Sequence, residues 1–129
     1  MNKRIIAYLL SLVTMVTLGS NNNKKVIHAE IGSLVAKELY NMEDDICQAI
    51  KYHALGNPNM SILDKIVFIA DKYARKDSNS FIEELKELAY YNLDEAIVKY
   101  LKKLKQRLAS NNLIFNNISH DTLVALDKK

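Results

Sequence analysis

The sequence is poor in residues that interrupt helices, with three glycines and one proline among 129 residues. Apolar residues make up 49% of the chain and charged residues 26%, so long helices can run almost without a break. No alternation of apolar and polar residues is long enough for a sheet, and no internal repeat is visible. We therefore expect an all-α fold, a compact single-domain bundle of six or seven helices around one core.

Cysteine is equally scarce. Cys47 is the only cysteine, which excludes an intramolecular disulfide and a cysteine-based zinc site. Its position between Ile46 and Ile50 favours a small buried residue over a nucleophile.

Neither sign of charge dominates, because 18 basic and 15 acidic residues give a net charge of +3. The densest basic cluster falls on one late helix and consists of Lys99, Lys102, Lys103, Lys105 and Arg107. Such a cluster can meet nucleic acid or phosphate. It is more often a solvated face, so we expect no nucleic-acid partner.

The N-terminal segment, residues 1–23, has two readings. Lys3 and Arg4 precede an uncharged, mostly apolar run from Ile5 to Leu18, which is the outline of a secretory signal. The run is short and threonine-rich for a membrane span, and the residues before Ser20 lack the usual alanines. A buried helix of a globular domain has the same composition, and the residues alone do not separate the two.

Helix signals follow a polar connection at residues 20–25. They predict an amphipathic helix from near His28, a helix from about Glu43 to Tyr52, and a turn at Gly56 and Pro58. Four later helices are expected to begin at residues that suit an N-terminal cap. These caps are Ser61 with Asp64, Ser80 with Glu83, Asn92, and Ser119 before a short last helix around residues 122–126.

Three residues could carry chemistry: His28, His53 and Asp71. No local motif joins them, so the fold would have to bring them together. Asp71 follows Val67 and Phe68 on one helical face, where a carboxylate is costly to bury unless it is paired or bound to a cation. The residues by themselves favour an ion pair at the edge of the apolar stripe, with Arg75 or Lys72 as partner.

Longer stretches resemble the YqeK-type branch of the HD-domain metal-dependent phosphohydrolases. The resemblance runs from Lys24 to the C-terminus and rests on "HAEIGSLVAKE", "AIKYHALGNPNMSILDKIVFIAD", "LDEAI" and "ISHDTLVAL". It implies an HD-type helical domain over residues 24–129. It also implies a cytoplasmic enzyme that cleaves diadenosine tetraphosphate, or another dinucleoside polyphosphate, symmetrically into two molecules of ADP.

The resemblance also implies roles for single residues. His28, His53 and Asp71 would be ligands of a two-metal site that holds divalent or mixed-valence iron, and a metal of this kind activates water. Lys65 and Arg75 would contact the polyphosphate of the nucleotide. No catalytic residue beyond the metal ligands is identified.

The family pattern further requires a His-Asp pair and another histidine upstream of His28. Residues 1–27 contain neither histidine nor aspartate. One alignment places Ser11 and Leu12 where the pair belongs, which makes residues 1–23 the remnant of the family's helix. We expect a shortened or frameshifted reading frame, and weak or absent hydrolase activity because ligands are missing. The "SHD" at Ser119 to Asp121 is expected to cap a helix and not to replace the pair.

Two alternatives stay open. The chain could be a non-catalytic nucleotide-binding module that uses Lys65, Lys72 and Arg75. It could also be an exported or membrane-anchored helical protein, through residues 3–19, in which the histidines are incidental. The oligomeric state cannot be predicted from the sequence.

Overall fold

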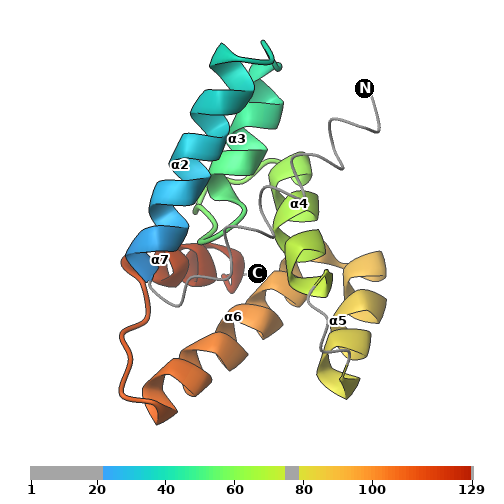
Figure 1. The fold of residues 1–129 in the computed structure, drawn as a ribbon. Coiled ribbons are helices and arrows are strands. Elements are labelled where there is room, and N and C mark those ends of the chain that lie inside the picture. The colour runs from blue at the N-terminus through green and yellow to red at the C-terminus, as the bar shows by residue number, and fades with distance from the viewer. Residues whose placement is uncertain (1–21, 75–78, 129) are drawn as a thin grey trace.

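The computed structural model describes residues 22–74 and 79–128, and within these ranges it consists of six helices with no strand (Figure 1). The helices are α2 (Asn22–Glu38), α3 (Asp44–Tyr52), α4 (Ile62–Tyr73), α5 (Ser80–Tyr91), α6 (Leu93–Ser110) and α7 (Asn117–Leu126). The predicted all-α class is confirmed.

The helices form two groups. α2 and α3 lie side by side as one helical pair, and α4 packs against α3 (Figure 1). α5 and α7 each pack against α6, which also contacts α4. A loop at residues 53–61 connects α3 to α4, so this loop lies where the two groups meet.

The larger core lies between α4, α6 and α7. Phe68 from α4, Ile97 and Leu101 from α6 and Leu123 from α7 are buried against one another. A smaller cluster lies in the α2–α3 pair and contains Ala36, Met42, Cys47 and Ile50. Cys47 is buried there, as its apolar neighbours predicted.

Two predicted caps are confirmed. Ser61 and Asp64 form a full capping box, in which the Asp64 backbone N–H donates to Ser61 Oγ and the Ser61 backbone N–H donates to an Asp64 carboxylate oxygen. Asn92 accepts a hydrogen bond from the Glu95 backbone N–H at 3.1 Å and begins α6.

Two other predicted caps are wrong. α5 begins after Asn79, whose extended backbone places Oδ1 at 3.0 Å from the Ile82 backbone nitrogen, so Ser80 is already the first helical residue. α7 begins after Asn116, whose side chain accepts from the Ile118 backbone N–H. Ser119 therefore lies inside α7 and caps nothing.

α2 also differs from the prediction. It begins at Asn22, six residues before His28, so residues 22–25 are helical and not a connection. No glycine or proline stands between Asn22 and His28 to end a helix there. The predicted N-terminal segment, residues 1–23, lies outside the described residues apart from this first turn of α2.

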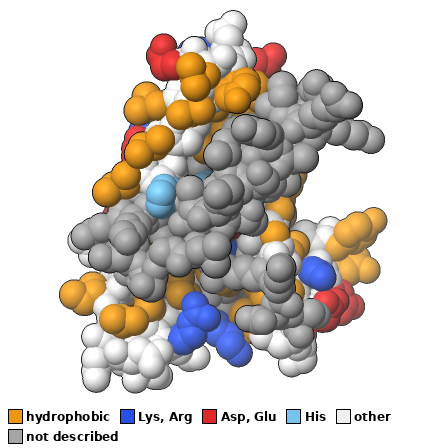
Figure 2. All heavy atoms as spheres, in the orientation of Figure 1, with side chains coloured by type: hydrophobic (Ala, Val, Ile, Leu, Met, Phe, Trp, Pro, Cys, Tyr) orange, Lys and Arg blue, Asp and Glu red, His pale blue; other side chains and the backbone are white. Residues whose placement is uncertain are grey.

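The buried face of α2 is its small-residue face. Ala29 and Ala36 are buried, and a Cβ at Gly32 would lie only 3.3 Å from the Ile50 side chain, so small residues allow α2 and α3 to approach closely. Larger apolar residues of α2 remain on the surface, at Ile27, Ile31 and Leu34, and so does Leu39 just after the helix. Figure 2 shows apolar side chains along this side of the molecule.

No helix within residues 22–74 and 79–128 is both long enough and apolar enough to cross a membrane.

Candidate active site

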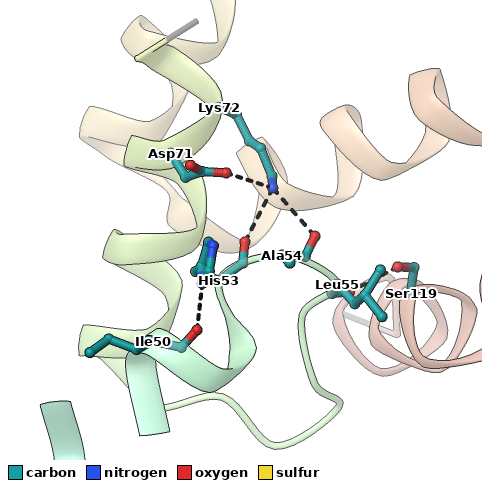
Figure 3. A network of polar contacts seen from close by, with 7 residues as sticks. All are labelled: Ile50, His53, Ala54, Leu55, Asp71, Lys72 and Ser119. Carbon is teal, nitrogen blue, oxygen red and sulfur yellow. Dashed lines mark hydrogen bonds and ion pairs between the residues drawn. The ribbon is translucent and has the colours of Figure 1, made fainter. Parts of the chain in front are cut away.

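His53 and Asp71 lie next to each other where α3 ends and α4 faces the loop (Figure 3). His53 is the C-terminal cap residue of α3, and Asp71 is in the last turn of α4. Both side chains are buried, with exposed fractions of 4% and 7% for the two residues. The fold therefore brings together two of the three residues that the sequence marked as metal ligands.

The His53 ring is fixed by a backbone contact. Its Nδ1 lies against the carbonyl oxygen of Ile50. A carbonyl only accepts, so Nδ1 carries the proton and Nε2 keeps its lone pair. Burial lowers the pKa of His53, although the contact with Ile50 and the charge of Asp71 act in the opposite direction. His53 is thus a neutral imidazole in the tautomer that metal-binding histidines commonly have.

The Asp71 carboxylate is paired with a lysine. Lys72 Nζ lies 3.1 Å from Asp71 Oδ2 and also donates to the carbonyl oxygens of His53 at 3.1 Å and Ala54 at 3.4 Å (Figure 3). Of the two predicted partners, Lys72 is therefore present, whereas Arg75 lies outside the described residues. The pair is buried, however, and not at the edge of the apolar stripe as expected.

Lys72 itself is almost completely enclosed. Its exposed fraction is 2%, and Nζ lies 4.4 Å from the centroid of the Phe68 ring and 5.5 Å from that of Tyr100. Aromatic faces attract cations, and the effect grows when water is excluded. Lys72 is therefore an interior cation whose protons are used within the protein, and nucleotide binding by Lys72 stays a prediction.

His28 does not complete a metal site with these two residues. It is half-buried on α2. Among residues 22–74 and 79–128, no three histidine, cysteine, aspartate or glutamate side chains are grouped so that they could hold a metal ion. Residues 1–27 contain none of these four residue types. The ligand prediction for His28, His53 and Asp71 stays a prediction.

Lys65, a predicted polyphosphate contact, forms an ion pair. Its Nζ lies 2.7 Å from Asp94 Oδ1 in the first turn of α6, and both side chains are largely shielded from water. A phosphate group would have to compete with Asp94 for Lys65. Arg75, the other predicted contact, lies outside the described residues, and neither assignment is tested.

The "SHD" segment has a role that sequence reasoning missed. Ser119 is buried, and its Oγ donates to the carbonyl oxygen of Leu55 at 2.9 Å. Nearby, Gly56 has φ = 86°, and a Cβ there would lie 3.0 Å from Thr122. α7 thus holds the loop that carries His53, and only the glycine at position 56 could have suggested a tight approach.

A hollow of about 180 Å³ lies beside this loop. Tyr52, Leu55 and Asn57 line it from α3 and the loop, Ala29 from α2, and Ile118 from α7. It is bordered by the sequence neighbours of both histidines, His28 and His53. Its volume is below the roughly 300–1,000 Å³ of typical ligand pockets, so it has room for no more than part of a nucleotide.

The basic cluster of α6 is on the surface. Lys99 pairs with Glu84 at 2.8 Å, Lys102 pairs with Asp127 at 3.1 Å, and Lys103 lies 4.3 Å from the centroid of the Phe81 ring. These contacts agree with the expectation that the basic cluster forms a solvent-exposed surface.

Comparisons with known proteins give a family and a fold. The model of the HD domain family matches residues 9–76, a little over half of the chain. A symmetrical bis(5'-nucleosyl)-tetraphosphatase from Bacillus subtilis is 30% identical over 93 residues, which are 71% of this chain and 50% of that protein. The protein of the same name from Halalkalibacterium halodurans is 36% identical over 78 residues, 60% of this chain and 42% of that one. The chain spans about half the length of these curated relatives.

A solved structure supports the same fold. The crystal structure of a predicted HD superfamily hydrolase involved in NAD metabolism, from Clostridium acetobutylicum, superposes with a TM-score of 0.76 at 21% sequence identity. The match covers 94% of this chain and 67% of that one. At this identity the likeness establishes the fold alone.

Proposed function

The chain belongs to the HD-domain family, and we propose that it is a metal-dependent phosphohydrolase domain for dinucleoside polyphosphates whose own activity is weak or absent. The substrate class follows from relatives that carry the name of symmetrical bis(5'-nucleosyl)-tetraphosphatase. The substrate we propose is diadenosine tetraphosphate, with ADP as product, in the cytoplasm.

The observation that supports this function best is that the His53 and Asp71 side chains lie close to each other in the interior (Figure 3). A neutral imidazole whose Nδ1 donates to a carbonyl offers the lone pair of Nε2 to a metal ion, near a buried carboxylate. If a divalent ion, for which we propose iron, displaced Lys72 from Asp71, His53 and Asp71 would help to hold it, and it would supply neutralisation of the polyphosphate charge and activation of water. Both residues lie within the segment that the family model matches.

The donors that the structure describes do not fit a complete two-metal centre. No third ligand joins His53 and Asp71 within the described ranges, and Asp71 already has a cation beside it in Lys72. We therefore derive no hydrolytic step for this chain. We therefore expect low activity, and nucleotide binding without turnover is the second candidate function.

Nucleoside binding has a place in the same region. The hollow lined by Tyr52, Leu55 and Asn57 adjoins the loop that carries His53. Tyr52 and Leu55 offer apolar surface for a base, and Asn57 offers polar groups for its edge. We propose that one adenosine of the dinucleotide lies here, with its phosphates toward His53 and Asp71.

Two matched variants test this placement. Ile118 and Val124 are both 42% exposed on α7, but only Ile118 lines the hollow. Ile118→Trp should narrow the hollow and weaken binding of ADP by roughly tenfold, whereas Val124→Trp should leave it unchanged. Calorimetric titration with ADP measures both, and equal affinities of the two variants would refute the placement.

An activity assay tests the function itself. Diadenosine tetraphosphate is incubated with the chain and ferrous iron without oxygen, and ADP release is compared with that of the Bacillus subtilis relative. We expect turnover reduced by about 100-fold or more, because no third ligand joins His53 and Asp71 among residues 22–74 and 79–128. Turnover equal to that of the relative would contradict the impairment, and binding of ADP without turnover would establish the second candidate function.

A further inference from the structure

Lys72 is held in the way that a protein holds a bound cation. Its Nζ carries three protons, and three oxygens accept from it: Asp71 Oδ2, His53 O and Ala54 O. These oxygens come from α4 and from the loop after α3, and Figure 3 shows them converging on the one nitrogen. A buried charge is tolerated only when it is paired and hydrogen-bonded in this complete manner.

The aromatic rings enclose the same charge from other sides. Phe68 is fully buried on α4, one helical turn before Lys72, and Tyr100 comes from α6. Phe68 and Tyr100 also meet edge to face, with ring centroids 5.9 Å apart. The ammonium position is therefore built by α4, by α6 and by the loop, and is not the chance result of a flexible surface side chain.

We propose that Lys72 is the resident counter-cation of Asp71 and takes the place of a metal ion in holding His53 and Asp71 together. Lys72 is on this account a positioning residue. It keeps the shape of the half-site without metal, and it competes with any divalent ion for the Asp71 carboxylate. This inference depends on the proposed function in one respect, which is that Asp71 is taken to be a metal ligand.

The variant that tests the proposal is Lys72→Met, which keeps an unbranched side chain only one atom shorter and removes its charge. In EDTA its melting temperature should fall by about 10 °C, because Asp71 is left buried without a partner. Excess manganese chloride should restore roughly half of that loss or more by binding at Asp71 and His53. The unchanged chain should melt within about 1 °C of the same temperature in EDTA and in manganese.

Two further variants serve as controls for the melting temperatures of Lys72→Met. Lys99→Met removes an exposed lysine of the Lys99–Glu84 pair and should change neither the melting temperature nor its response to manganese. The double variant Asp71→Asn with Lys72→Met removes both charges. In EDTA its melting temperature should be higher than that of Lys72→Met, and manganese should not change it. The double variant should fold even if Lys72→Met does not.

Several results would overturn the proposal. They are a Lys72→Met protein that melts like the unchanged chain in EDTA, one that manganese does not stabilise, or a double variant no more stable than the single one. None of these measurements involves a nucleotide or turnover. A failure to cleave or bind diadenosine tetraphosphate would therefore contradict the proposed function but not the proposed role of Lys72. The two proposals can be refuted separately.

Discussion

The α2–α3 pair and the α4–α6–α7 group are held together by different means. The α4–α6–α7 group buries large side chains such as Phe68, Ile97 and Leu101. The α2–α3 pair relies on a small cluster around Ala36 and Cys47 and leaves large apolar residues of α2 exposed. The two histidines predicted as ligands belong to the thinly packed pair, and Asp71 belongs to the well-packed group.

Polar contacts join the two regions at the loop after α3. Lys72 from α4 donates to the carbonyls of His53 and Ala54, and Ser119 from α7 donates to that of Leu55. Three successive carbonyls are thus fixed by side chains of the well-packed group. The position of His53 depends on these donors as much as on its own helix.

The largest expected effect tests the difference in packing. Phe68→Ala should lower the free energy of unfolding by about 3 to 5 kcal/mol, since it removes a fully buried ring and one wall around Lys72. Met42→Ala in the smaller cluster should cost about 2 kcal/mol. Urea unfolding of both variants measures the difference, and an equal or larger loss for Met42→Ala would break the comparison.

The Lys65–Asp94 ion pair gives the next effect. Lys65→Met should cost about 2 kcal/mol, because it leaves a largely shielded carboxylate with one partner fewer. If Lys65 also contacts polyphosphate, Lys65→Met should weaken ADP binding and Asp94→Asn, which releases Lys65, should strengthen it. Unchanged ADP affinity in both variants would assign Lys65 a structural role only.

A smaller effect is expected from the bond between α7 and the loop. Ser119→Ala should lower the free energy of unfolding by about 1 kcal/mol, because the partly buried Leu55 carbonyl loses its donor. Ser110→Ala is the control, since the exposed Ser110 hydroxyl bonds only within α6, to Gln106 O. Thermal melts compare the two, and equal melting temperatures would show that Ser119 does not fix the loop.

The smallest expected effect is a pH dependence from His53. In the unfolded chain histidine has a pKa of about 6.5, and burial lowers the pKa of His53 in the folded state, where Asp71 and Lys72 face it. Between these two pKa values the unfolded state binds more protons, so stability rises with pH in this window. The contribution of His53 is complete above the unfolded pKa and is lost as the pH falls below it.

Paired histidine variants isolate this contribution. His53→Gln should lose less stability than the unchanged chain between about pH 7.5 and pH 5.5, measured by urea unfolding. His120→Gln, at an exposed position on α7, should behave like the unchanged chain. An identical pH profile for His53→Gln would contradict the assignment.

The sequence predicted what depends on near neighbours along the chain. The capping box of Ser61 and Asp64 needs only residues three apart, and it is present. Asn79 and Ser80 are both good caps, however, and the backbone of Asn79 decides between them. Ser119 was misassigned because its partner, Leu55, is 64 positions away.

The candidate site shows the same limit. A partner for Asp71 at Lys72 could be proposed from adjacency, but the burial of the pair depends on Tyr100 of α6 and on the carbonyls after α3. The buried face of α2 was obscured because Ile31 and Leu34 dominate its pattern, whereas Ala29 and Ala36 make the contact. Periodicity shows which residues share a face but not which face packs.

The central claim is that His53 and Asp71 form a half-site whose cation is Lys72 and not a bound metal. The most direct measurement is the metal content of the purified chain, by mass spectrometry after incubation with ferrous iron without oxygen and gel filtration. We predict much less than about one retained ion per chain, because Lys72 occupies the Asp71 carboxylate and no third ligand joins His53 and Asp71 in the part of the chain that the structure describes. Two retained ions per chain would contradict the account.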